Sequence, residues 1–138
     1  MDFSSLNWLA VLACVVFTMV SGSIWFGPKT LYPVWWKALG MGEKAPPKAT
    51  PLTWILVVVT SLVQNVFLAF MVNAMSNMFA GSSLISGALT GFLVWVGFVA
   101  TTGLVNKLFT AQYRAWMLEQ GNHLINFVVC GAILGAWR

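Results

Sequence analysis

Charged residues are scarce in this chain. Seven lysines and arginines and three acidic residues make up only 7% of its 138 residues, whereas soluble domains carry about 25%. Hydrophobic residues account for 59% instead. This balance excludes a soluble globular domain and indicates a membrane protein. The length suits four spans of about 20 residues each, so residues 1–138 are expected to form a single transmembrane domain.

Histidine and cysteine are nearly absent as well. One histidine and two cysteines, without a Cys-x-x-Cys pattern, argue against a metal site built from protein ligands, and no cofactor is expected. No nucleophile–base pair, acidic dyad or phosphate-binding loop is present, so the sequence predicts no enzyme and no catalytic residue. Cys14 and Cys130 lie within apolar segments, where thiols act as small packing groups, and both are expected to be free.

Four apolar segments carry the fold prediction. They lie at about residues 6–26, 52–80, 84–105 and 123–137. The predicted fold is therefore all-α, an integral membrane four-helix bundle. Short segments rich in Trp, Tyr and Lys follow the first and third spans and are expected to lie in the membrane interface. The fourth segment is short for a span, so its helix must begin earlier or sit in thinned lipid.

The second span, 52–80, carries polar residues along one helical face. At about 100° per residue, most of them fall within an arc of roughly 120°. They are Ser61, Asn65, Asn73 and Ser76, with Asn77 just beyond the arc. An unpaired amide in hydrocarbon costs several kcal/mol, so this seam should pack against other helices or line a polar path. Asn65 in particular is expected to be buried near the glycine face of the third span.

Small residues recur every four positions in two spans. Ser83, Gly87 and Gly91 form one such face, and Gly131 and Gly135 form another. Faces of this kind let helix backbones approach closely inside a membrane.

One constellation offers proton chemistry. If the last helix extends back to Trp116, then Glu119, His123 and Asn126 share a face at i, i+4 and i+7. Glu119 and His123 are then either an interfacial pair that shields itself near the headgroups, or a proton-linked pair. In the second case His123, whose ordinary pKa is about 6.5, gates access to the polar seam.

The basic residues predict an orientation. Six lie on the connections after the first and third spans, namely Lys29, Lys37, Lys44, Lys48, Lys107 and Arg114. Only Arg138 lies with the chain ends. Because cytoplasmic loops carry the excess of Lys and Arg, both termini are expected to be external and both basic connections cytoplasmic. The basic residues are scattered, so no nucleic-acid partner is expected.

Several motifs together resemble a known family. They are Asn-Trp-Leu-Ala-Val at 7–11, Ile-Trp-Phe-Gly-Pro at 24–28, Trp-Lys-Ala-Leu-Gly at 36–40, and residues 91–98 and 131–138. Over nearly its whole length the chain is similar to small, mostly bacterial integral membrane proteins catalogued only as a domain of unknown function. The resemblance implies four helices and an inner-membrane location, and it supplies no activity.

Two functions fit these observations. The favoured one is a structural or accessory membrane protein, surrounded by lipid, that forms a homo-oligomer or joins a larger complex through its helix faces. The alternative is a small solute or ion carrier or channel with a polar path along the second span. The first is preferred because proton-coupled carriers usually need a buried acid or base, and none lies clearly in mid-membrane.

Overall fold

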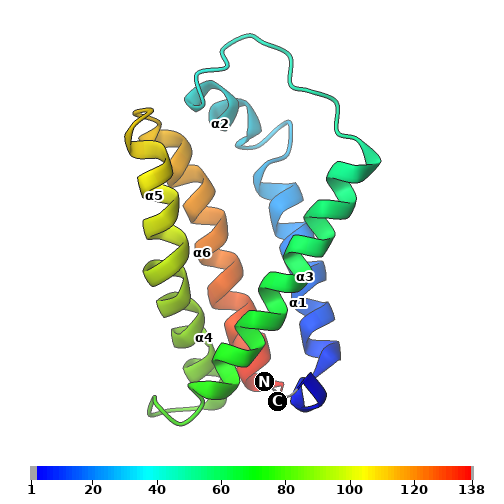
Figure 1. Ribbon diagram of the computed structural model, residues 1–138, viewed down its shortest axis with the longest axis vertical. Helices are drawn as coiled ribbons and strands as arrows, with labels where there is room; N and C mark the ends of the chain where they lie inside the picture. The colour runs from blue at the N-terminus through cyan, green and yellow to red at the C-terminus, as the bar shows by residue number, and fades with distance from the viewer. Residues whose placement is uncertain (1–2, 138) are drawn as a thin grey trace.

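The computed structural model describes residues 3–137, which form helices joined by short connections, with no strand among them (Figure 1). In chain order the elements are η1 (Phe3–Ser5), α1 (Trp8–Trp25), α2 (Tyr32–Ala38), α3 (Pro51–Ala74), α4 (Ser83–Val94), η2 (Trp95–Ala100), α5 (Thr101–Leu108) and α6 (Tyr113–Ala136). The segment η2 is π-helical, and it joins α4 and α5 into one helix, Ser83–Leu108. The expected all-α fold is confirmed.

Three helices are long and apolar enough to cross a membrane, namely Trp8–Trp25, Pro51–Ala74 and Ser83–Leu108. They support the expectation of a membrane protein. The helix α6 is as long as α3, at 24 residues, but its first half carries several polar side chains. The sequence predicts four spans. Among the described residues, three helices qualify as membrane spans by their length and composition.

The helix α3 ends earlier than the sequence predicts. It stops at Ala74 rather than at residue 80, and the chain turns at once, with the Met78 amide donating to the Met75 carbonyl. Its 24 residues already extend about 36 Å, more than the roughly 30 Å hydrocarbon core, so no further turn is needed. Ser76 and Asn77 therefore lie beyond the helix.

The helix α6 begins ten residues before the predicted start of the fourth span, at Tyr113 instead of residue 123. The turn before it explains the difference. Ala111 adopts a positive φ of 54°, and the amides of Ala111 and Gln112 donate to the carbonyls of Leu108 and Lys107. This Schellman-type ending closes α5 and lets α6 start directly, so the fourth helix is not short.

Both ends of the described chain lie at the same end of the molecule, beside the connection from α3 to α4 (Figure 1). Asn7 joins them, because its side-chain amide donates to the Trp137 carbonyl at 2.7 Å. The same side chain caps α1 by accepting from the amides of Leu9 and Ala10. The short helix α2 lies at the opposite end. Arg138, counted with the chain ends in the charge comparison, lies outside the described residues.

The helices α4 and α6 form the most extensive helix pair. Their small-residue faces pack against each other: a Cβ added at Gly91 would meet the Phe127 carbonyl, and one at Gly131 would meet the Gly87 carbonyl. The backbones therefore touch directly, as small-residue faces allow. The glycine face of α4 is thus covered by α6, and the expectation that it lies beside Asn65 is wrong.

The helices α1 and α6 meet at the two cysteines. The Cys14 thiol donates to the Cys130 carbonyl at 3.6 Å, and the Cys130 thiol donates to the Cys14 carbonyl at 3.7 Å. Both thiols are free and buried, as expected.

The buried apolar residues of α1, α3 and α6 lie in the half of each helix that is nearer the chain termini. The buried cluster there includes Ala10, Val11, Leu68, Val72 and Leu134. Residues 51–60 at the start of α3 are instead all exposed. The helix α3 accordingly slants away from α6 toward the α2 end (Figure 1).

The contact between α4 and α6 yields a first prediction. Gly91→Ala would push a methyl group into the Phe127 backbone, and overpacking of this kind costs about 1–3 kcal/mol. The unfolding temperature in detergent, followed by circular dichroism, should fall.

Gly97→Ala is the matched control, because a Cβ at Gly97 meets no atom within 4 Å. Its unfolding temperature should stay unchanged or rise. Equal melting of the two variants would contradict the close approach of α4 and α6.

Candidate functional site

A cleft opens where α3 diverges from the other helices. It has a volume of about 650 Å³ and is lined by residues of α1, α2, α3 and α6. Sites for small molecules typically measure about 300–1,000 Å³, so the cleft has the size of such a site. Its polar lining includes Thr18, Ser61, Glu119, Asn122, His123 and Asn126.

Polar side chains of α6 and α3 form the floor of the cleft, and the Asn65 amide is buried beside the lining residues Thr18 and Ser61. On α6, the Asn126 side chain donates to Asn122 Oδ1 at 3.1 Å, and the Asn122 side chain donates to Ser21 Oγ at 3.0 Å. On α3, the Asn65 side chain donates to the Ser61 carbonyl at 3.0 Å and to Thr18 Oγ1 at 3.5 Å. Asn65 therefore faces α1, and it is fully buried.

Three polar atoms at this floor have no hydrogen-bond partner among residues 3–137. They are Ser61 Oγ, Asn65 Oδ1 and Asn126 Oδ1. Their residues are 6%, 0% and 2% exposed, and Ser61 and Asn126 line the cleft itself. A buried acceptor left without a partner costs about 1–3 kcal/mol. Three such atoms in one place indicate a position where a guest molecule or water completes the bonding.

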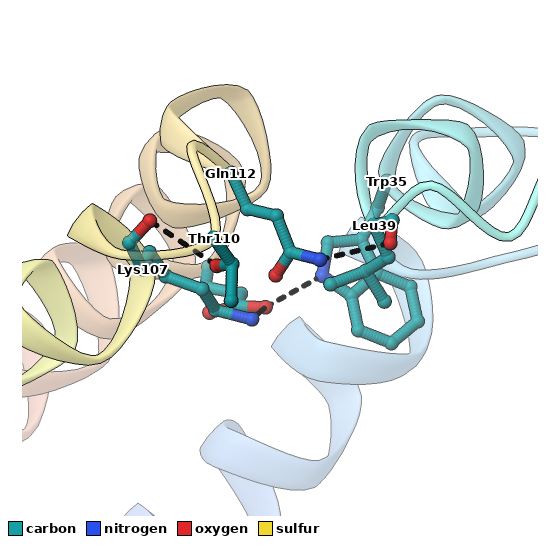
Figure 2. A network of polar contacts seen from close by, with 6 residues as sticks. Trp35, Leu39, Lys107, Thr110 and Gln112 are labelled. Carbon is teal, nitrogen blue, oxygen red and sulfur yellow. Dashed lines mark hydrogen bonds and ion pairs between the residues drawn. The ribbon is translucent and has the colours of Figure 1, made fainter.

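A polar network holds α2 against the bundle at the mouth of the cleft. The Trp35 indole N–H donates to Glu119 Oε1 at 2.9 Å, and the same oxygen lies 3.2 Å from Lys107 Nζ. Beside it, Gln112 reaches from the start of α6 to the Leu39 carbonyl at 2.9 Å (Figure 2). These contacts join α2, α5 and α6 at the open end of the molecule.

The predicted polar seam is divided by the structure. Ser61 lines the cleft, and Asn65 is fully buried one helical turn away. Asn73 lines a separate small cavity of about 50 Å³ near the chain ends. The Ser76 carbonyl accepts from Ser86 Oγ, and Asn77 is exposed. The five residues therefore do not share one surface.

Glu119 and His123 both line the cleft. The hydrogen-bond and ion-pair partners of Glu119 are Trp35 and Lys107. These contacts place the carboxylate at the mouth, one helical turn from the partly buried His123. The proton-linked pair stays a prediction.

Thr18, Ser21 and Asn122 were not singled out by the sequence. Thr18 and Ser21 lie in an apolar run, where a hydroxyl usually bonds back to its own helix. Asn122 stands four residues before Asn126, and this spacing is the one signal that could have revealed the amide pair. Within residues 3–137, no three His, Cys, Asp or Glu side chains come together as a group that could hold a metal ion.

The attachment of α2 can be tested directly. Trp35→Phe keeps an aromatic ring beside Phe26 but removes the N–H that Glu119 accepts. A partly exposed bond to a carboxylate contributes about 1 kcal/mol. Amides of α2 should therefore exchange with deuterium faster, with little change in the unfolding temperature.

Trp36→Phe is the control, because the Trp36 indole donates to the Lys44 carbonyl in the connection that follows α2. The α2 amides should keep the wild-type exchange rate in that variant. The same acceleration in both variants would contradict the role of Glu119 in holding α2.

Comparison with known proteins identifies a family but no activity. No curated protein and no solved structure matches the chain. The family described as "Protein of unknown function (DUF1761)" matches residues 9–135, which include α2 to α5 whole and nearly all of α1 and α6. The resemblance noted in the sequence is thereby confirmed, and the chain belongs to this family of proteins of unknown function, DUF1761.

Proposed function

We propose that this protein is a small-solute carrier, which binds its solute in the cleft between α1, α3 and α6 and exchanges it with water at the α2 end. The observation that carries this proposal is the set of unpaired buried acceptors, Ser61 Oγ, Asn65 Oδ1 and Asn126 Oδ1, beside a cleft of about 650 Å³. Polar groups are expensive inside a membrane and, when present, usually mark a solute or ion pathway.

The proposal includes α6 as a fourth span. Asn126 donates to Asn122, and Asn122 donates to Ser21 of α1, so the amide nitrogens of both side chains have partners within the protein. The second half of α6 packs against α4 through Gly131 and Gly135. A helix whose polar groups are turned inward can cross a bilayer although it is less apolar than its neighbours.

The proposed orientation places the α2 end in the cytoplasm and both chain ends outside, in a bacterial inner membrane. What supports it is the charge distribution, since six of the seven basic residues lie on the connections at the α2 end. The cleft would then open toward the cytoplasm.

The accessory role, as a homo-oligomer or a subunit of a larger complex, remains the alternative. The start of α3 favours it, because Leu52, Ile55, Val59 and Val63 are all exposed apolar side chains. Lipid covers such a face equally well, and the unpaired acceptors play no part in this alternative. The carrier therefore accounts for more of the structure.

Water access to the cleft is the first test. In a Ser61→Cys variant the introduced thiol should react with a membrane-impermeant thiol reagent in inverted vesicles but not in right-side-out vesicles. The native Cys14 and Cys130 are 0% and 1% exposed, so they contribute little background. A Gly22→Leu change should slow the reaction, because Gly22 lines the cleft and has free space at its Cβ.

Val63→Cys is the control on the same helix, since Val63 is exposed on the apolar face and should be shielded by lipid. Equally low reactivity of the Ser61→Cys and Val63→Cys variants would contradict the access of water to the cleft.

Native mass spectrometry then separates the carrier from the accessory role. A small molecule retained by wild type and lost in Gly22→Leu supports the carrier, and an empty protein bound in a heteromeric complex supports the accessory role.

The proton-linked pair has its own test on the Ser61→Cys background. Protonated His123 would repel a cationic methanethiosulfonate reagent more than an uncharged one of similar size. The ratio of the two rates should therefore fall as the pH is lowered from about 8 to 5.

His123→Gln should make this ratio independent of pH. The other titratable groups lining the cleft are Glu119 and Tyr32, with Lys107 paired to Glu119, and the variant leaves them in place. An unchanged pH profile in His123→Gln would remove His123 as the sensor.

A further inference from the structure

The floor of the cleft offers hydrogen-bond acceptors that have no partner in the protein. The amide nitrogens of Asn65, Asn122 and Asn126 all donate to protein oxygens. The hydroxyls of Thr18 and Thr60 donate to carbonyls of their own helices. The polar atoms without a partner are Ser61 Oγ, Asn65 Oδ1 and Asn126 Oδ1. The two amide oxygens can only accept, and the Ser61 hydroxyl can accept as well as donate, so a hydrogen-bond donor suits this floor.

The charges around the cleft favour a cation. No lysine or arginine belongs to its described lining, whereas the carboxylate of Glu119, which is paired with Lys107, does. A phosphate or carboxylate would meet acceptor oxygens at the floor without a fixed positive charge, and its desolvation would be uncompensated. An ammonium group has three donors and no acceptor, which complements the two unpaired oxygens of the lining, Ser61 Oγ and Asn126 Oδ1.

Aromatic rings line the entrance. Phe26, Tyr32, Trp35 and Trp54 all contribute to the cleft, and the ring of Trp35 lies 5.4 Å from that of Phe26 and 5.5 Å from that of Tyr32. Rings of this kind attract an ammonium group on its way in and pack against an apolar body that follows it.

We infer that the solute of this cleft is a primary amine with an apolar body, whose ammonium group binds Ser61 Oγ and Asn126 Oδ1 while the body lies against the aromatic rings near α2. This inference rests on the proposed solute cleft and names its substrate class. The same chemistry occurs in a free arylalkylamine and in the headgroup of phosphatidylethanolamine.

The test uses the full-length protein in nanodiscs of phosphatidylcholine, a lipid without a primary amine. Binding of 2-phenylethylamine is measured by calorimetry beside two probes of similar shape, the neutral 2-phenylethanol and the anionic 3-phenylpropionate. The amine should bind, and the two other probes should bind at least tenfold more weakly, roughly the loss of a hydrogen bond to a charged group.

Variants locate the site. Asn126→Leu removes an unpaired acceptor of the cleft lining at similar volume, so amine affinity should fall about tenfold. It also removes the hydrogen bond to Asn122 Oδ1, so the unfolding temperature should fall as well, and binding is measured below that temperature. Asn73→Leu is the control, because Asn73 lies outside the cleft. Its amine affinity should equal that of wild type.

The source of the amine follows from a second nanodisc containing phosphatidylethanolamine. Two results together assign the cleft to the lipid headgroup. Phosphatidylethanolamine competes with 2-phenylethylamine for binding, and native mass spectrometry finds this lipid retained by wild type but not by Asn126→Leu. Undiminished binding of 2-phenylethylamine assigns it to a free amine.

Equal binding of the alcohol or the carboxylate would overturn the amine inference and leave the carrier in place. Absence of binding by every probe and by the lipid would also overturn it, and the thiol reactivity of the Ser61→Cys variant would then decide separately whether the cleft is wet.

Discussion

The apolar side chains that α1, α3 and α6 bury against one another lie in the half of the molecule that holds both ends of the described chain. Burial at that end fixes the angle between α1 and α3, and the exposed first turns of α3 follow from it. The floor amides lie where this packing ends. A bundle packed evenly along its length would have no cleft. Apolar side chains at the start of α3 are exposed instead of packed against α6, and this uneven burial creates the site.

The sequence predicted the parts of this fold that depend on composition and spacing. It predicted the all-α fold, the two small-residue faces and the free thiols at Cys14 and Cys130, because each of these depends on residues close together in the chain. The sequence did not predict which helix faces pack against each other. Asn65 and the glycines of α4 both need a neighbour, but periodicity does not say which helix supplies it, and the structure pairs Asn65 with Thr18 and Gly91 with the Phe127 backbone.

The start of α6 shows a second limit of sequence reasoning. Its polar residues suggested an interface segment followed by a short span, because polarity alone does not show whether a side chain has a partner. Glu119 is paired with Lys107 and Trp35, and Asn122 with Ser21. These partners come from elsewhere in the chain, so a continuous helix forms through the polar stretch. They also keep the carboxylate at the mouth of the cleft and leave its floor uncharged.

The π-helical segment η2 sets the rotational register between the two halves of the helix Ser83–Leu108. Gly87 and Gly91 in the first half face α6, and so does Gly103 in the second half, against Gln120 and Trp116. A π-helix turns less per residue than an α-helix, which brings both halves onto the same side. Losing one residue here would rotate α5 by about 100°, whereas exchanging one side chain for another would not. Along Trp95–Ala100 the fold thus constrains the number of residues more strictly than their identity.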